Sequence, residues 1–406
     1  MQKLAKLKTK VIIALVFLLF LFFFTNDLGL IDIEKTTIVT ALSIDSEENG
    51  EYQITAQLAV PEATDTNSEK TKAQVSGRGA TIAAAIKSIS DYSGWYPQLS
   101  FCKLIILSNN FKDKNIITVI DYFARTLRIQ DSALVVMADG SAREILEASS
   151  PLDNISSFAL QKVLLKKPGF DRDVATCDIK TFCTGYYSLS GSSYMPIVKL
   201  KKDIASSSQS STGSASTQAN SGKSVSSVNK DDSLLFDAQR TALFKNGIKT
   251  GEISADLTLI YNLLTKDFGD GSIELKNINT ELNKTNNYFI HIEENSKQIK
   301  VNITDYDIEV VIKLDLYCKI SDQNSTSTDI TFSKNLPLPP EVKKALKQKL
   351  EDEIEMLVQN MRSSNCDLLN IQERLYRYHH SKYNLFKDNY LSVMKTKVDI
   401  TVQGQK

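Results

Sequence analysis

The stretch "IEVVIKLDLYCKI" at residues 308–320 alternates apolar and polar side chains without a break. Successive residues of a β-strand point to opposite faces of a sheet, so the pattern predicts one long strand with a single buried face. The apolar positions are Ile308, Val310, Ile312, Leu314, Leu316, Cys318 and Ile320. Such a row needs an apolar partner surface elsewhere in the chain.

The sequence "LPPEVKKALKQKLEDEIEMLVQNM" at 338–361 predicts that partner. Proline suits a first helical turn, and apolar residues recur at helical spacing: Val342, Ala345, Leu346, Leu350, Ile354, Leu357, Val358 and Met361. The outer face carries lysines before acids, an order that opposes the helix dipole. Pairs such as Lys347 with Glu351 partly compensate, and this polarised face is either solvated or turned to a partner.

The rest of the chain predicts more sheets and helices. "TIVTALSID" (37–45) and "EYQITAQLAV" (51–60) indicate a hairpin, and "FCKLIIL" (101–107) and "ALVVMA" (133–138) are fully apolar strands around a helical pattern. Strand, helix, strand predicts a βαβ crossover in a sheet covered on both faces. "ALFKNGIKTGEI" predicts a second hairpin with its turn at Asn246-Gly247.

These elements define an α+β fold class, with several domains of mixed sheets and packed helices after one N-terminal membrane segment. A length of 406 residues fits two or three domains. The expected parts are a signal or anchor segment (1–31), an N-terminal α+β domain (32–200), a serine-rich flexible linker (201–232), a small middle α+β domain (233–276) and a C-terminal α+β domain (277–406).

The N-terminal segment has lysines at positions 3, 6, 8 and 10, followed by an apolar run from Val11 to Phe24. This is the layout of a secretory signal, yet no pair of small residues marks a cleavage site, and no cysteine precedes Cys102 for lipid attachment. The run covers only about 21 Å of a ~30 Å hydrocarbon core. A cleaved signal is one reading, but we expect an uncleaved anchor that holds the rest of the chain outside the cytoplasm.

Charge and cysteine content narrow the function. Forty-eight basic and 48 acidic residues leave no net charge, which argues against nucleic acid as a partner. Five cysteines without a CxxC motif make a metal site improbable. Cys177 and Cys183 are close enough in sequence to form a disulfide if this part of the chain is exported.

No catalytic constellation is found. Of the three histidines, His291, His379 and His380, the last two are adjacent and cannot both face one metal from a regular helix. "SGRGAT" lacks the preceding apolar strand of a phosphate loop. Charges in "ARTLRIQDS" either bind an anionic ligand or are solvated: Arg125, Arg128 and Asp131. We therefore expect a non-enzyme with no catalytic, cofactor-binding or metal residues, no cofactor, and an unknown ligand site.

Four stretches together resemble one family. They are "IEKTTIVTALSID" (33–45), the region from "GRGATIAAAIKSIS" through "FCKLIILSNN" to "DYFARTLRIQDSALVVMADGSAREIL" (77–146), "TALFKNGIKTGEISADLTLIYNLLTKDFGDGSIEL" (241–275) and "SNCDLLNIQERLYRYHHSKYNLFKDNYLSVMKTKVDITVQG" (364–404). In this order they resemble the C subunits of bacterial spore germinant receptors, the Ger(x)C proteins. The chain departs from that family where a lipid-modified cysteine is usual, near Leu28 to Ile31.

The resemblance implies three mixed α+β domains on the outer face of the spore inner membrane. It implies partners, a transporter-like subunit and a second membrane subunit, in a complex that detects nutrients and triggers germination without catalysis by this subunit. Two other hypotheses remain open: a membrane-anchored extracytoplasmic solute-binding protein, and an exported enzyme such as a cell-wall hydrolase.

Overall fold

The structure is a computed structural model. The residues it describes are 10, 12–20, 36–59, 73–111, 114–126, 129–148, 150, 153, 155–165, 173–202, 234–266, 271–279, 285–303, 307–325 and 338–404. The expected linker (201–232) lies outside them, apart from its first two residues, which end a strand. The expected membrane segment (1–31) is described only at 10 and 12–20.

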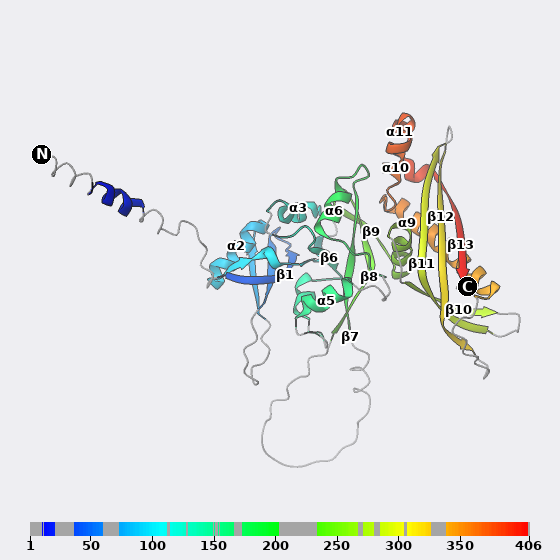
Figure 1. Cartoon of the computed structure of the whole chain (residues 1–406), viewed down its shortest axis with the longest axis horizontal. Coiled ribbons are helices and arrows are strands. Elements are labelled where there is room, and N and C mark those ends of the chain that lie inside the picture. The colour runs from blue at the N-terminus through cyan, green and yellow to red at the C-terminus, as the bar shows by residue number, and fades with distance from the viewer. Residues whose placement is uncertain are drawn as a thin grey trace, which may run out of the picture.

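The N-terminal apolar run is helical over 12–20, and all of these side chains are exposed. In Figure 1 this helix stands apart from the body, beyond the end that carries β1 (Thr36–Ser46) and α2 (Ile82–Ser93). In the part of the chain that is described, no helix combines the length and the hydropathy needed to cross a membrane.

The larger sheet has nine strands. Its path is β3 (Gln74–Gly79), β2 (Tyr52–Leu58), β1, β5 (Leu104–Leu107), β6 (Leu134–Ala138), β7 (Ser192–Lys202), β8 (Leu234–Lys245) and β9 (Ile248–Ile253), and β4 (Tyr96–Gln98) pairs with the start of β1. The four central strands β1, β5, β6 and β7 are parallel, and antiparallel strands extend the sheet on both sides. Both predicted hairpins are confirmed.

The turn of the second hairpin shows why its sequence could be interpreted. Asn246 and Gly247 have φ angles of 51° and 76°. Two consecutive positive φ angles define the turn whose twist matches the flanking strands, and Asn-Gly is the pair that adopts them most readily. The positive φ angle at Gly247 favours glycine there, and a Cβ atom would in addition meet the side-chain oxygen of Asn115.

Helices cover both faces of the larger sheet. On one face lie α2, α3 (Ile117–Thr126) and α6 (Ile179–Tyr186), and on the other lie α4 (Ala142–Glu147) and α5 (Ser156–Leu164). Strand β5 supplies both cores in alternation: Ile105 belongs to the first and Ile106 to the second. The predicted βαβ unit, β5–α3–β6, is thus confirmed together with its two-sided burial.

The smaller sheet has four strands in the order β10 (Gly271–Asn279), β11 (Thr285–Ile303), β12 (Ile308–Ser325) and β13 (Met394–Gly404). Strand β12 contains the stretch 308–320, and its alternate residues from Ile308 to Cys318 are buried. Helix α9 (Pro340–Ser363) covers that face with the stripe from Val342 to Met361. Of the other face, Lys313 and Asp315 are exposed, so this sheet is covered on one side.

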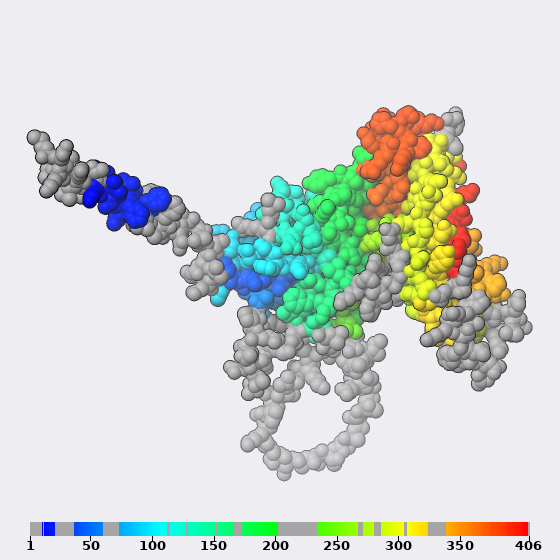
Figure 2. Space-filling model, in the orientation of Figure 1, coloured from blue at the N-terminus to red at the C-terminus, as the bar shows by residue number. Residues whose placement is uncertain are grey.

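After α9 the chain forms α10 (Ile371–Tyr378), α11 (His380–Phe386) and α12 (Tyr390–Val393) before it enters β13. Strand β13 runs parallel to β12, from the pair Ile308 with Met394 to the pair Cys318 with Gly404. Each sheet and the helices packed on it form one unit of the molecule. Figure 2 shows the two units side by side, with α10 and α11 at one end of the smaller sheet.

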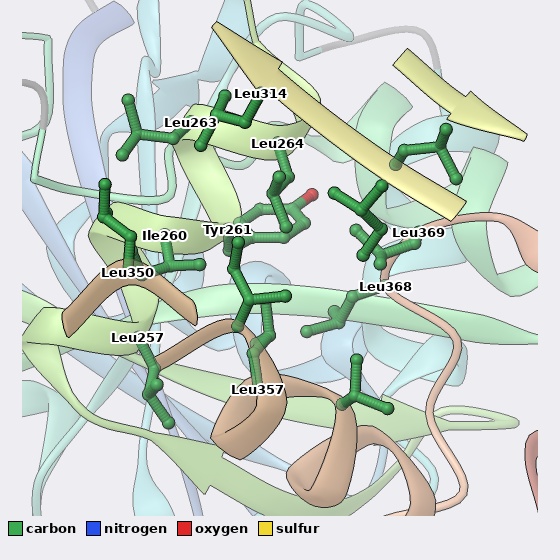
Figure 3. Close-up of a cluster of buried hydrophobic side chains, with 14 of the residues drawn as sticks. Leu257, Ile260, Tyr261, Leu263, Leu264, Leu314, Leu350, Leu357, Leu368 and Leu369 are labelled. Atoms are coloured by element: carbon green, nitrogen blue, oxygen red, sulfur yellow. The ribbon is translucent and has the colours of Figure 1, made fainter. Parts of the chain in front are cut away.

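The connection between the two units differs from the domain division that the sequence predicts for residues 233–276. Helix α8 (Ala255–Thr265) begins after its N-cap Ser254 and connects β9 to β10. Figure 3 shows its leucines in one core with Leu314 of β12 and Leu357 of α9. The same core includes Leu243 and Ile253 of the larger sheet. The stretch 233–276, expected as a small middle domain, therefore gives β8 and β9 to one sheet and β10 to the other, and has no sheet of its own among the described residues.

The serine-rich stretch also has a different place from that of a linker between units. Strands β7 and β8 are antiparallel neighbours, and Lys202 pairs with Leu234. The chain thus leaves the larger sheet and returns to it at one point. The amino-acid composition of this stretch could not predict this, because strand pairing depends on partners that lie far apart in the sequence.

Candidate functional site

A buried polar junction joins the two units. The turn between α9 and α10 reaches the larger sheet, where the Cys366 thiol faces the carbonyl oxygen of Phe244 at 3.5 Å. Beside it, the backbone N–H of Asp367 donates to the hydroxyl oxygen of Ser192 at 2.9 Å. Burial raises the pKa of Cys366 to about 12, so the thiol stays neutral. This turn fastens the C-terminal helices to β7 and β8.

Asp367 is the central group of this junction. Its buried carboxylate accepts hydrogen bonds from the backbone N–H of Ile371 at 3.0 Å and of Gln372 at 2.8 Å, and from the hydroxyl of Tyr390 at 3.2 Å. Burial raises the pKa of Asp367 although these donors act in the opposite direction. The carboxylate therefore satisfies the start of α10 and links it to α12.

Further polar contacts hold the same interface. The side-chain amide of Asn262 on α8 donates to the carbonyl oxygen of Val174 at 3.1 Å, and both groups lie in the junction. The N–H of Leu189 donates to the Glu373 carboxylate at 3.2 Å. Together with the shared apolar core, these contacts make the two units one packed body.

The junction was not predicted from the sequence. The available signal was local: an asparagine or aspartate immediately before an apolar-periodic segment is typical of a helix start, and Asn370 stands directly before α10. That signal says nothing of the contact with Ser192, which lies far away in the sequence.

The sequence-predicted anion site is not assembled from its described members. Arg125 pairs with Asp121 on its own helix at 2.6 Å, and Asp131 contributes its backbone oxygen to the N–H of Lys180. Arg128 lies outside the described residues. Arg125 is therefore engaged by a neighbouring acid.

The histidines have separate surroundings. His379 faces the carbonyl oxygen of Val301 at 2.7 Å, and His380 packs edge-on against Tyr376. His291 lies beside the Ser272 hydroxyl. Within the described ranges, no three histidine, cysteine or carboxylate side chains are grouped as metal ligands would be.

The disulfide considered between Cys177 and Cys183 is not formed, and all five cysteines are free. Cys177 precedes α6 and is buried in the core of the larger sheet, whereas Cys183 lies within α6 and is half-buried. Burial raises the pKa of both thiols. Closeness in sequence did not translate into a disulfide bond.

The glycines of "SGRGAT" have a packing role. Gly77 and Gly79 lie in β3, directly under α2. A Cβ atom at Gly79 would lie 2.6 Å from the backbone nitrogen of Ala85, and one at Gly77 would collide with the oxygen of the same residue. These glycines let the helix approach the strand closely, which accounts for them without a phosphate.

A first surface hollow of about 500 Å³ lies between α8, α9 and β10. Its charged residues include Asp256, Glu274, Lys349 and Glu353. Lys349 lies 3.6 Å from the carboxylate of Glu353, whose pKa is raised by burial first and by Asp256 in addition. The Lys347–Glu351 pair on α9 is also formed, at 3.7 Å.

A second hollow, of about 550 Å³, lies at the start of β1 and is mostly apolar. Four large apolar side chains in it are exposed: Ile38 (44%), Phe101 (57%), Phe158 (42%) and Leu165 (54%). Lys103 and Lys162 flank them. Sequence reasoning missed this surface because its residues come from four separate segments.

Comparisons with known proteins identify the class. A family model described as the spore germination protein N-terminal domain matches residues 30–200, and one described as spore germination B3/GerAC like, C-terminal, matches residues 239–405. The chain belongs to the GerAC-like family of spore germination proteins, the C subunits of germinant receptors.

A solved relative supports the fold. The crystal structure of the GerBC protein is 16% identical and has a TM-score of 0.51, covering 92% of this chain and 100% of that one. At this identity the likeness concerns the fold. A search of curated protein sequences found no match.

Proposed function

We propose that the chain acts as a non-enzymatic C subunit of a membrane-bound nutrient germinant receptor. The observation that carries this proposal is the ordered match of the two family models over residues 30–200 and 239–405. The described polar groups support it, because the most buried carboxylate, that of Asp367, is occupied by three internal donors and leaves no free base at the junction.

In this proposal the subunit works with a transporter-like subunit and a second membrane subunit. The N-terminal apolar run, Val11 to Phe24, stays attached as an anchor, and the two packed units stand on the outer face of the spore inner membrane. Mass spectrometry of the mature protein tests the anchor, because a chain that begins near residue 26 to 30 contradicts it.

Gene deletion tests the function. Spores without the gene are expected to form normally, to fail to germinate in response to the nutrient, and to germinate with a trigger that bypasses nutrient receptors. Re-expression of the full chain is the control and should restore the response. Normal nutrient germination in a deletion strain without a paralogue contradicts the proposal.

The hollow between α8, α9 and β10 favours a second candidate, an anchored solute-binding protein. Its volume of about 500 Å³ and its mixed charges suit a small polar molecule such as an amino acid. Titration calorimetry of the full chain with amino acids and sugars separates the candidates. Heat that disappears in Glu353→Gln supports solute binding, whereas a scaffold subunit gives no heat.

A further inference from the structure

The hollow at the start of β1 is lined by large apolar side chains that are exposed to solvent. Ile38, Phe101, Phe158 and Leu165 each leave at least 42% of their area accessible, although they lie together around one hollow of about 550 Å³. Contiguous exposed apolar groups with polar neighbours are typical of binding surfaces for proteins or membranes. Something apolar is expected to cover this face.

The chain itself indicates what lies nearby. The N-terminal apolar run ends at Phe24, and β1 begins at Thr36. Twelve residue steps span at most ~40 Å when fully extended. Because Ile38 is only two residues inside β1, a bilayer that holds the apolar run lies within reach of the hollow.

The surrounding residues have the chemistry of a membrane interface. Tyr96 pairs with Thr36, the first residue of β1, so its chain neighbour Trp95, which is 48% exposed, lies near this end of the strand. Lys103 at the rim of the hollow is a long cation that can reach lipid headgroups while its stem covers apolar area, whereas Lys162 on the same rim is paired with Asp153 at 2.9 Å. Tryptophan and tyrosine are enriched at headgroup level.

A polar detail fits the same environment. The side-chain nitrogen of Gln161, which lies in the wall of the hollow, is buried and has no hydrogen-bond partner among the described residues. A lipid ester carbonyl is an acceptor of the kind that this amide lacks, and it accompanies an acyl chain that an apolar hollow accommodates.

We propose that this face, defined by Ile38, Phe101, Phe158 and Leu165, docks onto the surface of the bilayer that holds the N-terminal run. The inference rests on the anchor in the proposed function. It adds an orientation: the larger sheet lies near the lipid, and the smaller sheet, at the opposite end of the molecule from the N-terminal helix in Figure 1, points away from it.

Bromine quenching of tryptophan fluorescence tests this orientation in the full chain. Trp95 is the only tryptophan, so Trp95→Phe gives a dark background. Phe101→Trp then places the reporter on the proposed docking face, and Tyr378→Trp places it on α10, where Tyr378 is 74% exposed. Each protein is reconstituted into phosphatidylcholine–phosphatidylglycerol vesicles, with or without bromine on the upper acyl carbons.

The expected result is that the reporter at position 101 loses most of its emission in brominated vesicles, while the reporter at position 378 keeps its emission. Adding Phe158→Ser and Leu165→Ser should restore emission at position 101, and both residues are exposed enough for the chain to fold. The same measurement is made in vesicles of phosphatidylcholine alone, which carry no net charge. Quenching that persists there indicates apolar docking, whereas quenching that is lost indicates attraction by anionic headgroups.

Flotation of the same vesicles distinguishes the two proposals. A chain that floats but shows no quenching at position 101, or equal quenching at both positions, overturns the docking face and leaves the anchor intact. A chain that does not float overturns both. The emission at position 101 could instead be unaffected by brominated lipid and shift in wavelength when the other receptor subunits are added. That result assigns the face to a protein partner and overturns docking onto the bilayer.

Discussion

The two sheets of the molecule bury their strands in different ways. In the larger sheet, neighbouring residues of β5 point into different cores, with Ile105 on one face and Ile106 on the other. In the smaller sheet, Leu314 of β12 is buried against α9 while its neighbour Lys313 is exposed. The central strands of the larger sheet form an interior layer, whereas the smaller sheet has one open face, so substitutions on that open face should be tolerated better than those in the two cores.

The largest expected effect tests this contrast directly. Ile105→Ala and Ile106→Ala should each destabilise the protein by about 2–5 kcal/mol, because each leaves a cavity in a core. In β12, Leu314→Ala should cost a similar amount, but Lys313→Ala should stay within about 0.5 kcal/mol. Denaturant unfolding of the four variants measures the differences. Equal costs at Leu314 and Lys313 would contradict one-sided burial.

The next effect concerns the junction that joins the sheets. Asp367→Asn keeps the shape of the side chain but replaces an acceptor by a donor next to the N–H of Gln372. Leaving that buried N–H unsatisfied should cost about 1–3 kcal/mol, measured by thermal unfolding. Ser363→Ala, near the junction but at an exposed position, serves as the control and should have little effect.

The pH dependence of that difference has a defined sign. Burial raises the folded-state pKa of Asp367, so above ~4 the unfolded chain releases this proton before the folded chain does. The stability that this group contributes is therefore present at low pH and is lost as the pH rises through the folded-state pKa. The advantage of the wild type over Asp367→Asn should shrink along that range, and an advantage that grows with pH would contradict a raised pKa.

The smallest effect lies on the outer face of α9. Lys347→Ala removes the 3.7 Å pair with Glu351 and should cost only a few tenths of a kcal/mol, because exposed helical pairs are weak. Lys344→Ala on the same helix controls for the change in helix propensity. The free energy of unfolding of both variants is measured at low and at high salt. Because salt screens exposed charges, the difference between the variants should be smaller at high salt, whereas a salt-independent loss would indicate a packing role.

Short-range patterns made much of the fold predictable. The alternation at 308–320, the helical stripe from Val342 to Met361 and the Asn246-Gly247 turn each depend on neighbours within a few residues, and the structure confirms all three. The features that were missed depend on distant partners. Composition identified 201–232 as a linker, but the pairing of β7 with β8 places its ends in one sheet.

The candidate site was less accessible to sequence reasoning for the same physical reason. The docking face combines Ile38, Phe101 and Phe158, none of which is unusual in its own segment. Cys177 and Cys183 are close in sequence and yet have different environments. The membrane anchor at 11–24 stays a prediction, because its support comes from sequence and family membership.

The pairing of Lys202 with Leu234 has a practical consequence for the serine-rich excursion between them. Strand pairing holds both ends of the excursion together, so its length does not alter the register of either strand. In general, doubling the number of residues between two fixed chain ends costs only ~0.6 kcal/mol in closure entropy when the connecting chain is flexible. Insertions and deletions are therefore expected to accumulate here in relatives, and a fluorescent or affinity module inserted between these two residues should report on the receptor without perturbing the sheet.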